Sequence, residues 1–192
     1  YVFGNKNYVG AIAGKLTGNS ITIENVSVEA YVHVNNTSYC AQHAGFIGAT
    51  KGCTGSVVIR NCTFTGAVGD AAEGAHRGGF IGQADAGTSV LIEGCVNNGT
   101  VKGRDVGGIV GTAQVPTTII NCINNGAITK PTDGTAEKGC AGILGNAESA
   151  DTITVKNCIN NASITSNIAK TYTGGIVGRI AKNGTVNIIG CE

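Results

Sequence analysis

A five-residue block of small and apolar residues recurs six times along the chain. Its copies occupy residues 10–14, 44–48, 78–82, 107–111, 141–145 and 174–178, and their closing glycines are 34, 34, 29, 34 and 33 residues apart. A second signature follows each block, with an aliphatic residue three positions before a Cys or, in the first repeat, before Val26. A β-branched residue six positions further on marks a third segment in the first five repeats. A fixed period near 33 residues is typical of stacked repeats.

The composition indicates that the repeated unit is made of strands. The chain has 21 Ile and 18 Val against 3 Leu, with 31 Gly and no Met or Trp, and β-branched residues suit a pleated surface. Three short strands cannot bury their apolar faces alone, but stacked repeats give each strand a parallel neighbour. We therefore predict an all-β fold, a right-handed parallel β-helix of about six triangular coils of roughly 29–36 residues, the last incomplete. The alternative is an antiparallel sandwich, which would not need residue identity at a fixed period.

Size and charge limit the functional classes. The 192 residues suit one domain, residues 1–192, which we interpret as a segment of a longer chain. The net charge of +1 and the absence of a basic patch argue against binding nucleic acid through its phosphates. No run of eighteen apolar residues is present, so we expect no membrane insertion.

The combination of Gly107-Gly108-Ile109-Val110-Gly111 with the segment from Ile119 to Thr129, Ile-Ile-Asn-Cys-Ile-Asn-Asn-Gly-Ala-Ile-Thr, resembles the GLUG-type repeat. The resemblance covers residues 9–192, departing from the pattern at Val26 and in an insertion at residues 130–139. It implies a scaffold of the kind found in large bacterial surface proteins, including adhesins and the non-catalytic regions of some secreted proteases. It does not by itself specify an activity.

Two columns of repeated residues should face the core. The aliphatic column, preceded by Ile23, contains Ile59, Ile92, Ile119, Val155 and Ile188. The thiol column contains Cys62, Cys95, Cys122, Cys158 and Cys191. Asn or Gly precedes each Cys and tolerates left-handed backbone angles, so we expect a corner there that lets both columns point inward.

Two further ladders concern polar residues. Asn97, Asn124 and Asn160 fall in register and should hydrogen-bond along the axis, the alternative being a polar binding stripe. Glu24, Arg60 and Glu93 alternate in sign at outward positions and should form a surface ion ladder. Because these charges are exposed, each pair should contribute at most about 1 kcal/mol.

The cysteines favour free, buried thiols over a disulfide framework, since five stacked equivalents cannot all pair. A Cys40–Cys53 disulfide is the alternative outside the column. A metal site formed by His33, Cys40, His43 and Cys53 is a weaker alternative, because only Cys40 and His43 have the close spacing of zinc ligands. We therefore expect no cofactor and no metal.

No catalytic motif emerges. The acidic residues are scattered; Asp70, Glu73 and Asp105 are the set that could converge, although solvated loops are the simpler interpretation. We interpret His76-Arg77 as the solvated start of a strand rather than a catalytic pair. A carbohydrate-active β-helix would need clustered carboxylates and is the third hypothesis.

The first hypothesis is a non-enzymatic extracellular module of a cell-surface protein, acting as a rigid spacer or an adhesive surface. Its partners, a host glycan or protein, would contact the loops at residues 33–43, 69–77 and 130–139. The second hypothesis is a fibre component that self-associates through the exposed coil ends.

Overall fold

The structure is a computed structural model that describes residues 1–4, 7–34, 40–69, 74–131, 138–167 and 171–192. These residues contain strands and no helix. The strands pair in parallel with their equivalents one repeat away and form four sheets, A to D. The predicted all-β parallel β-helix is therefore confirmed.

The chain runs through the sheets in the order B, C, D and A within each coil. Sheet B contains β2 (Val9–Gly10), β6 (Cys40–Ala44), β10 (Gly74–Gly78), β15 (Val106–Gly107), β20 (Gly139–Ala141) and β25 (Tyr172–Gly174). Sheet C contains β3 (Ala13–Lys15), β7 (Ile47–Ala49), β11 (Ile81–Ala84), β16 (Val110–Ala113), β21 (Leu144–Ala147) and β26 (Val177–Ile180).

The second signature of the repeat forms sheet D and the third segment forms sheet A. Sheet D contains β4 (Ile21–Glu24), β8 (Ser56–Arg60), β12 (Ser89–Glu93), β17 (Thr117–Ile120), β22 (Ile153–Lys156) and β27 (Val186–Ile189). Sheet A contains β1 (Val2–Gly4), β5 (Ser27–Val34), β9 (Thr63–Val68), β13 (Val96–Asn97), β14 (Thr100–Lys102), β18 (Ile123–Asn124), β19 (Ile128–Lys130), β23 (Ile159–Asn160) and β24 (Ile164–Ser166).

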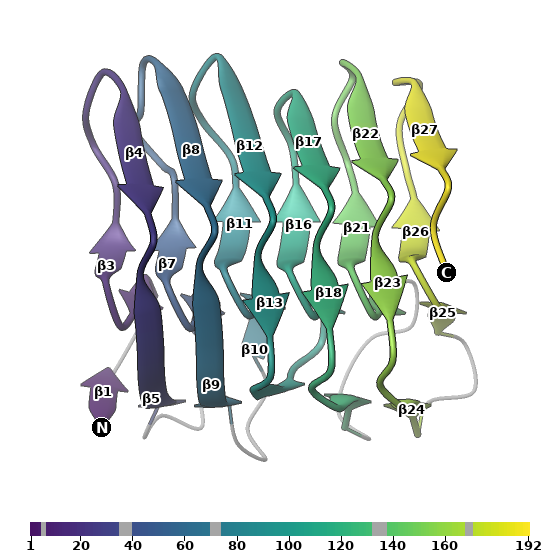
Figure 1. Cartoon of the computed structure of the whole chain (residues 1–192), viewed down its shortest axis with the longest axis horizontal. Helices are drawn as coiled ribbons and strands as arrows, with labels where there is room; N and C mark the ends of the chain where they lie inside the picture. Colours follow the sequence, from purple (N-terminus) through teal and green to yellow (C-terminus); the bar gives the residue numbers. More distant parts are fainter. Residues whose placement is uncertain (5–6, 35–39, 70–73, 132–137, 168–170) are drawn as a thin grey trace.

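The coil is right-handed. In Figure 1 the chain rises through sheet C at the back, descends through sheets D and A at the front, and advances from the N-terminus at the left to the C-terminus at the right. Sheet D is crossed six times, from β4 to β27, which makes about five turns, slightly fewer than the six coils expected.

Each of the first five coils has strands in four sheets rather than the three segments expected from the sequence. The difference lies in the glycine block, which bends in its middle and contributes one strand to sheet B and another to sheet C. At the bend a Cβ on Gly108 would overlap the carbonyl oxygen of Gly142 in the next coil, so the backbones approach too closely for a larger residue. The same bend buries two consecutive apolar side chains, such as Ile109 and Val110.

The core is continuous along the axis. The inward-facing aliphatic side chains of the central sheet D strands are fully buried, whereas Ile188 in the last sheet D strand is 47% exposed. The expectation that Ile188 lies in the core is therefore wrong for this residue. It occupies the inward register position, paired with Val155, but no described strand packs on its other side.

Candidate functional site

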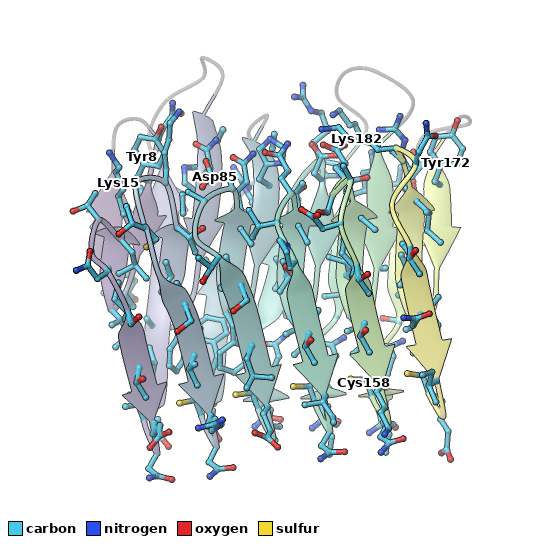
Figure 2. The ribbon with its side chains drawn as sticks, turned by 90° about the horizontal axis from the view of Figure 1, so that it is seen from above. Tyr8, Lys15, Asp85, Cys158, Tyr172 and Lys182 are labelled. Atoms are coloured by element: carbon cyan, nitrogen blue, oxygen red, sulfur yellow. The ribbon has the colours of Figure 1, made fainter. Side chains whose placement is uncertain are left out.

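The aliphatic and thiol columns lie side by side in the interior. Ile59, Ile92, Ile119 and Val155 have no exposed surface and are in register along sheet D. The thiols of Cys62, Cys95, Cys122 and Cys158 are also buried, and Cys191 is half-buried. Figure 2 shows their sulfur atoms in a row along one edge of the stack, with Cys158 labelled.

Every thiol of the column is hydrogen-bonded to backbone. Each Sγ lies 3.5–3.7 Å from the carbonyl oxygen of the aliphatic-column residue one coil back, as in Cys122 to Ile92 and Cys158 to Ile119. A second carbonyl, two residues before each Cys, lies within 3.0–3.5 Å. Burial raises the pKa of the Cys62 thiol, and hydrogen bonds with the thiols of Cys158 and Cys95 raise the pKa of Cys122 well above its usual value.

The three asparagines of the inner ladder are joined by their amides. Asn97 Nδ2 donates to Asn124 Oδ1 over 2.7 Å, and Asn124 Nδ2 donates to Asn160 Oδ1 over 2.8 Å. Asn97 and Asn124 have no exposed surface, and their remaining groups bond the turn backbone at Gly99 and Gly126. Their amides are therefore used within the fold and do not form an exposed polar stripe.

The charges of the outer ladder are in contact. Arg60 Nε lies 3.0 Å from Glu93 Oε2, and Arg60 Nη1 lies 3.3 Å from Glu24 Oε1. Hydrogen bonds to Glu93 and Glu24 raise the pKa of Arg60. These side chains are about 40% exposed, so water screens their attraction.

A second set of polar side chains meets where sheets B and C face each other. We call it the polar seam; its residues are Gln42, His76, Gln83, Asp105, Thr112 and Asn146. Gln42 Nε2 donates to Gln83 Oε1 over 2.6 Å, and His76 Nδ1 lies 2.8 Å from Thr112 Oγ1. Asn146 Nδ2 donates to Asp105 Oδ1 over 2.5 Å. The first two contacts join a strand of sheet B to one of sheet C in the next coil, and the third joins Asp105, directly before β15, to β21 of sheet C in the next coil.

The seam continues to its neighbours by further hydrogen bonds. Gln83 Nε2 donates to Gln114 Oε1, Gln114 Nε2 donates to Glu148 Oε2, and Arg179 Nη1 donates to Glu148 Oε1, over 3.0, 3.2 and 3.3 Å respectively. Together with the contact between Gln42 and Gln83, these hydrogen bonds form a series that starts at Gln42 in the second coil and joins each coil to the next up to Arg179 in the last coil. In Figure 2, Asp85, Tyr172 and Lys182 are labelled along the edge of the stack opposite Cys158.

Asp105 is the most deeply buried carboxylate described. It has no exposed surface, and its Oδ2 lies 3.7 Å from His76 Nδ1 and 3.8 Å from Lys138 Nζ. Burial lowers the pKa of His76 by more than the nearby carboxylate of Asp105 raises it. The interpretation of Asp105 as a solvated loop residue is therefore wrong, because it is enclosed between two sheets.

The geometry around His76 differs from that of an activated nucleophile. Such a site needs the carboxylate on one ring nitrogen and the hydroxyl on the other. Here Nδ1 lies near both Thr112 Oγ1 and Asp105 Oδ2, which is not that arrangement. The seam is built as a hydrogen-bonded contact between sheets.

Arg77 also differs from its sequence interpretation. It is fully buried rather than solvated, and its Nη1 donates to the carbonyl oxygen of Lys102 over 2.6 Å. Gly69, Gly74 and Gly103 line the Arg77 side chain: a Cβ on Gly69 or Gly74 would overlap the guanidinium, and one on Gly103 would overlap the aliphatic part. A signal for these positions was present in the sequence. His76 and Arg77 stand before their glycine block where Asp105 and Val106 stand before the next one, so the repeat places Arg77 beside the apolar Val106 and His76 beside Asp105.

The remaining sequence-based candidates do not form one site in the described part of the chain. His43 and Cys53 are buried, and Cys53 is a free thiol, which argues against the Cys40–Cys53 disulfide. No group of three or more potential metal ligands occurs among the described residues. The side chain of Cys40, and all of Asp70 and Glu73, lie outside those residues.

The three segments proposed as partner loops are shorter than expected. Their ends belong to strands: Cys40 begins β6, Gly74 begins β10, and Lys130 ends β19. What remains between the strands is residues 35–39, 70–73 and 132–137, which lie outside the described residues. In each case the preceding described strand belongs to sheet A and the following one to sheet B.

No family model, curated protein or solved structure matched this chain in our comparisons. Within the described residues, no helix has the length and apolar character needed to cross a membrane.

Proposed function

We propose that this chain is a rigid, non-enzymatic repeat module that acts as a spacer and lateral binding surface of a cell-surface protein. The observation that carries this proposal is the alignment of side-chain contacts with the stack axis. The inner asparagine ladder, the ion ladder and the polar seam all join one coil to the next. These contacts add to the backbone hydrogen bonds of four sheets, so bending or pulling the stack has to break both.

The polar groups of the interior support the same proposal. The side chains of Asp105, His76, Thr112 and Asn146 contact one another. The resemblance to GLUG-type repeats supports the cell-surface location, because that family occurs in bacterial surface proteins. We place a glycan or protein partner at the segments that follow sheet A strands and precede sheet B strands in the sequence, residues 35–39, 70–73 and 132–137.

Single-molecule pulling between the chain ends tests the spacer role. We expect the folded module to resist force and then to lengthen in steps that correspond to about 33 residues, one repeat each. Smooth extension at low force, without steps, would contradict a rigid spacer.

Two binding and activity measurements test the rest of the proposal. A glycan and host-protein array should retain a ligand that is lost when residues 132–137 are replaced by Gly and Ser, with circular dichroism unchanged. Incubation with polysaccharides tests the carbohydrate-active alternative. Products that form with the wild-type protein and not with Asp105→Asn would overturn the non-enzymatic assignment.

End-to-end self-association is a second candidate, favoured by the apolar side chains at the two ends. Ile180, Ile188 and Ile189 are 55%, 47% and 49% exposed at one end, and Phe3 and Ile12 are 61% and 45% exposed at the other. A second copy would place β4 against β27, continuing the aliphatic column. Sedimentation velocity should then show concentration-dependent growth that Ile188→Lys abolishes; a monomer at all concentrations would exclude this candidate.

A further inference from the structure

Asp105 and Lys138 are a carboxylate and an amine that meet between neighbouring coils, beside the polar seam. Lys138 Nζ lies 3.8 Å from Asp105 Oδ2. The Asp105 side chain has no exposed surface, whereas that of Lys138 is 27% exposed. An amine and a carboxyl group held this close are the two reactants of an amide bond. Their reaction would remove both charges, and with them the cost of keeping these charges out of water.

The backbone that carries both groups is fixed by the stack. Asp105 directly precedes β15, and Lys138 stands two residues before Cys140, which is in register with Val106 of β15. The carbonyl oxygen of Lys138 accepts a hydrogen bond from Lys130 Nζ over 3.0 Å. The partly exposed Lys138 side chain is therefore the part that moves for Nζ to reach Asp105 Cγ. Well-oriented reactants in one molecule reach effective concentrations of roughly 10⁵–10⁸ M.

The groups around Asp105 suit an attack on its carboxyl carbon. Asn146 Nδ2 donates to Asp105 Oδ1 over 2.5 Å, which stabilises the negative charge that develops on this oxygen when Nζ attacks. Asn146 is itself held in place, because Gly139 N donates to its Oδ1 over 2.9 Å. His76 Nδ1 lies 3.7 Å from Asp105 Oδ2, the oxygen that leaves, and is placed to act there as a general acid.

From this geometry we propose that Lys138 and Asp105 form an isopeptide bond that joins the fourth and fifth coils covalently. One proton passes from the Lys138 ammonium to the Asp105 carboxylate, which gives a neutral amine and a neutral acid. Nζ then forms a bond to Cγ, the bond from Cγ to Oδ2 breaks, and Oδ2 leaves as water after taking a second proton from Nζ. No other reactant is consumed, and the net charge of the chain is unchanged.

The intact mass of the full-length chain tests this proposal independently of the spacer role. The folded chain is purified, reduced, denatured and measured by mass spectrometry. We expect a mass that is lower than the sequence mass by one water, and after proteolysis a branched peptide that contains Asp105 and Lys138. A chain that is folded by circular dichroism but has the full sequence mass would overturn the proposal.

Three variants locate the bond. Lys138→Arg retains the positive charge without the reactive amine, and Asp105→Ala removes the carboxyl group, so both should have their full sequence mass. Lys102→Arg, at a half-buried lysine of β14, is the matched control and should lose one water as the wild type does. A water loss that persists in Lys138→Arg would come from another reaction, such as cyclisation at Asp133-Gly134, and would overturn the proposal. Loss of one ammonia in place of one water would also overturn it, because an amide side chain would then be the partner.

The role of Asn146 as a positioned donor has its own measurement. In freshly translated protein, water loss should be about 100-fold slower in Asn146→Ala than in the wild type, the usual effect of removing one such donor. Circular dichroism of the two proteins should be the same. An unchanged rate in the folded variant would overturn this mechanism of bond formation.

Discussion

The residue before each core thiol carries the backbone conformation that the coil needs at its corner. Asn25, Asn61, Asn121 and Asn157 have φ between 50° and 58°, and Gly94 and Gly190 have φ of 61° and 59°. Most residues lose roughly 1–2 kcal/mol in this left-handed region, while Gly and Asn adopt it readily. The corner turns the chain so that residues three apart both face the core.

Replacing Asn121 by Val should therefore lower the free energy of unfolding by about 1–2 kcal/mol, because a β-branched residue resists positive φ. Asn121→Gly is the matched control and should change stability little, since Gly94 and Gly190 occupy the same corner. Urea unfolding followed by circular dichroism measures both. If the two variants were equally unstable, the Asn121 side chain rather than its φ would be decisive.

His76 makes the polar seam sensitive to pH. The charged groups near its ring are Asp105, Lys138, Glu148 and Arg104, and burial lowers the pKa of His76 below its ordinary value near 6.5. The unfolded chain then binds a proton more readily than the folded one. The contribution of His76 to stability is thus complete above about pH 6.5, decreases as pH falls from there toward the lower native pKa, and changes no further below that pKa.

We expect the free energy of unfolding to decrease between pH 7.5 and 5 because of this group. His76→Gln should remove that part of the pH dependence, while His33→Gln, at a half-buried position in β5, should retain it. Urea midpoints at both pH values provide the measurement. An unchanged slope in His76→Gln would place the titrating group elsewhere.

At the scale of the element, the glycine block is a bend between two sheets rather than a single strand. A Cβ on Gly79, Gly108 or Gly142 would overlap backbone of the following coil. The equivalent Gly175 in the last coil has nothing within 4 Å of such a Cβ. The requirement for Gly therefore comes from the neighbouring coil and not from the local turn.

Gly108→Ala should destabilise the protein by about 1–3 kcal/mol, the usual cost of forcing extra atoms into a packed interior. Gly175→Ala carries the same change at the same place in the repeat and should be nearly neutral. Thermal and urea unfolding distinguish the two. Similar effects of both substitutions would mean that the local backbone, rather than coil-to-coil contact, demands glycine.

On the scale of the whole molecule, burial depends on position along the stack. Ile119 lies in the centre with no exposed surface, whereas Ile188, its equivalent in the last coil, is 47% exposed. The same position of the repeat is therefore buried in a central coil and partly exposed in the last one. The central coils have a neighbour on each side, and the last has a described neighbour on one side.

Ile119→Asp should abolish the β-sheet circular dichroism spectrum, because an unpaired charge would enter a dry core. Ile188→Asp should retain the spectrum, because its carboxylate reaches water. A folded Ile119→Asp variant would place this residue outside the core, and an unfolded Ile188→Asp variant would show that the last coil is covered in solution.

The sequence by itself determined the stacked fold, the inward columns and the corners, because these features depend on a periodic pattern. Stacking equivalent repeats in register places Ile59 on Ile92 and Asn97 on Asn124 without further information. The period also places His76 and Asp105 one coil apart. It does not specify which residues of another sheet face them.

Only the tertiary structure decided the environment of the polar residues and of the end coil. The bend at the glycine block brings sheets B and C together, which buries Asp105 beside His76 and Asn146. The space between Gly69, Gly74 and Gly103 encloses Arg77, and the end of the stack exposes Ile188. Each outcome depends on contacts between different sheets or on the presence of a further coil. Burial is set by such neighbours in space, which a repeat pattern along the chain does not encode.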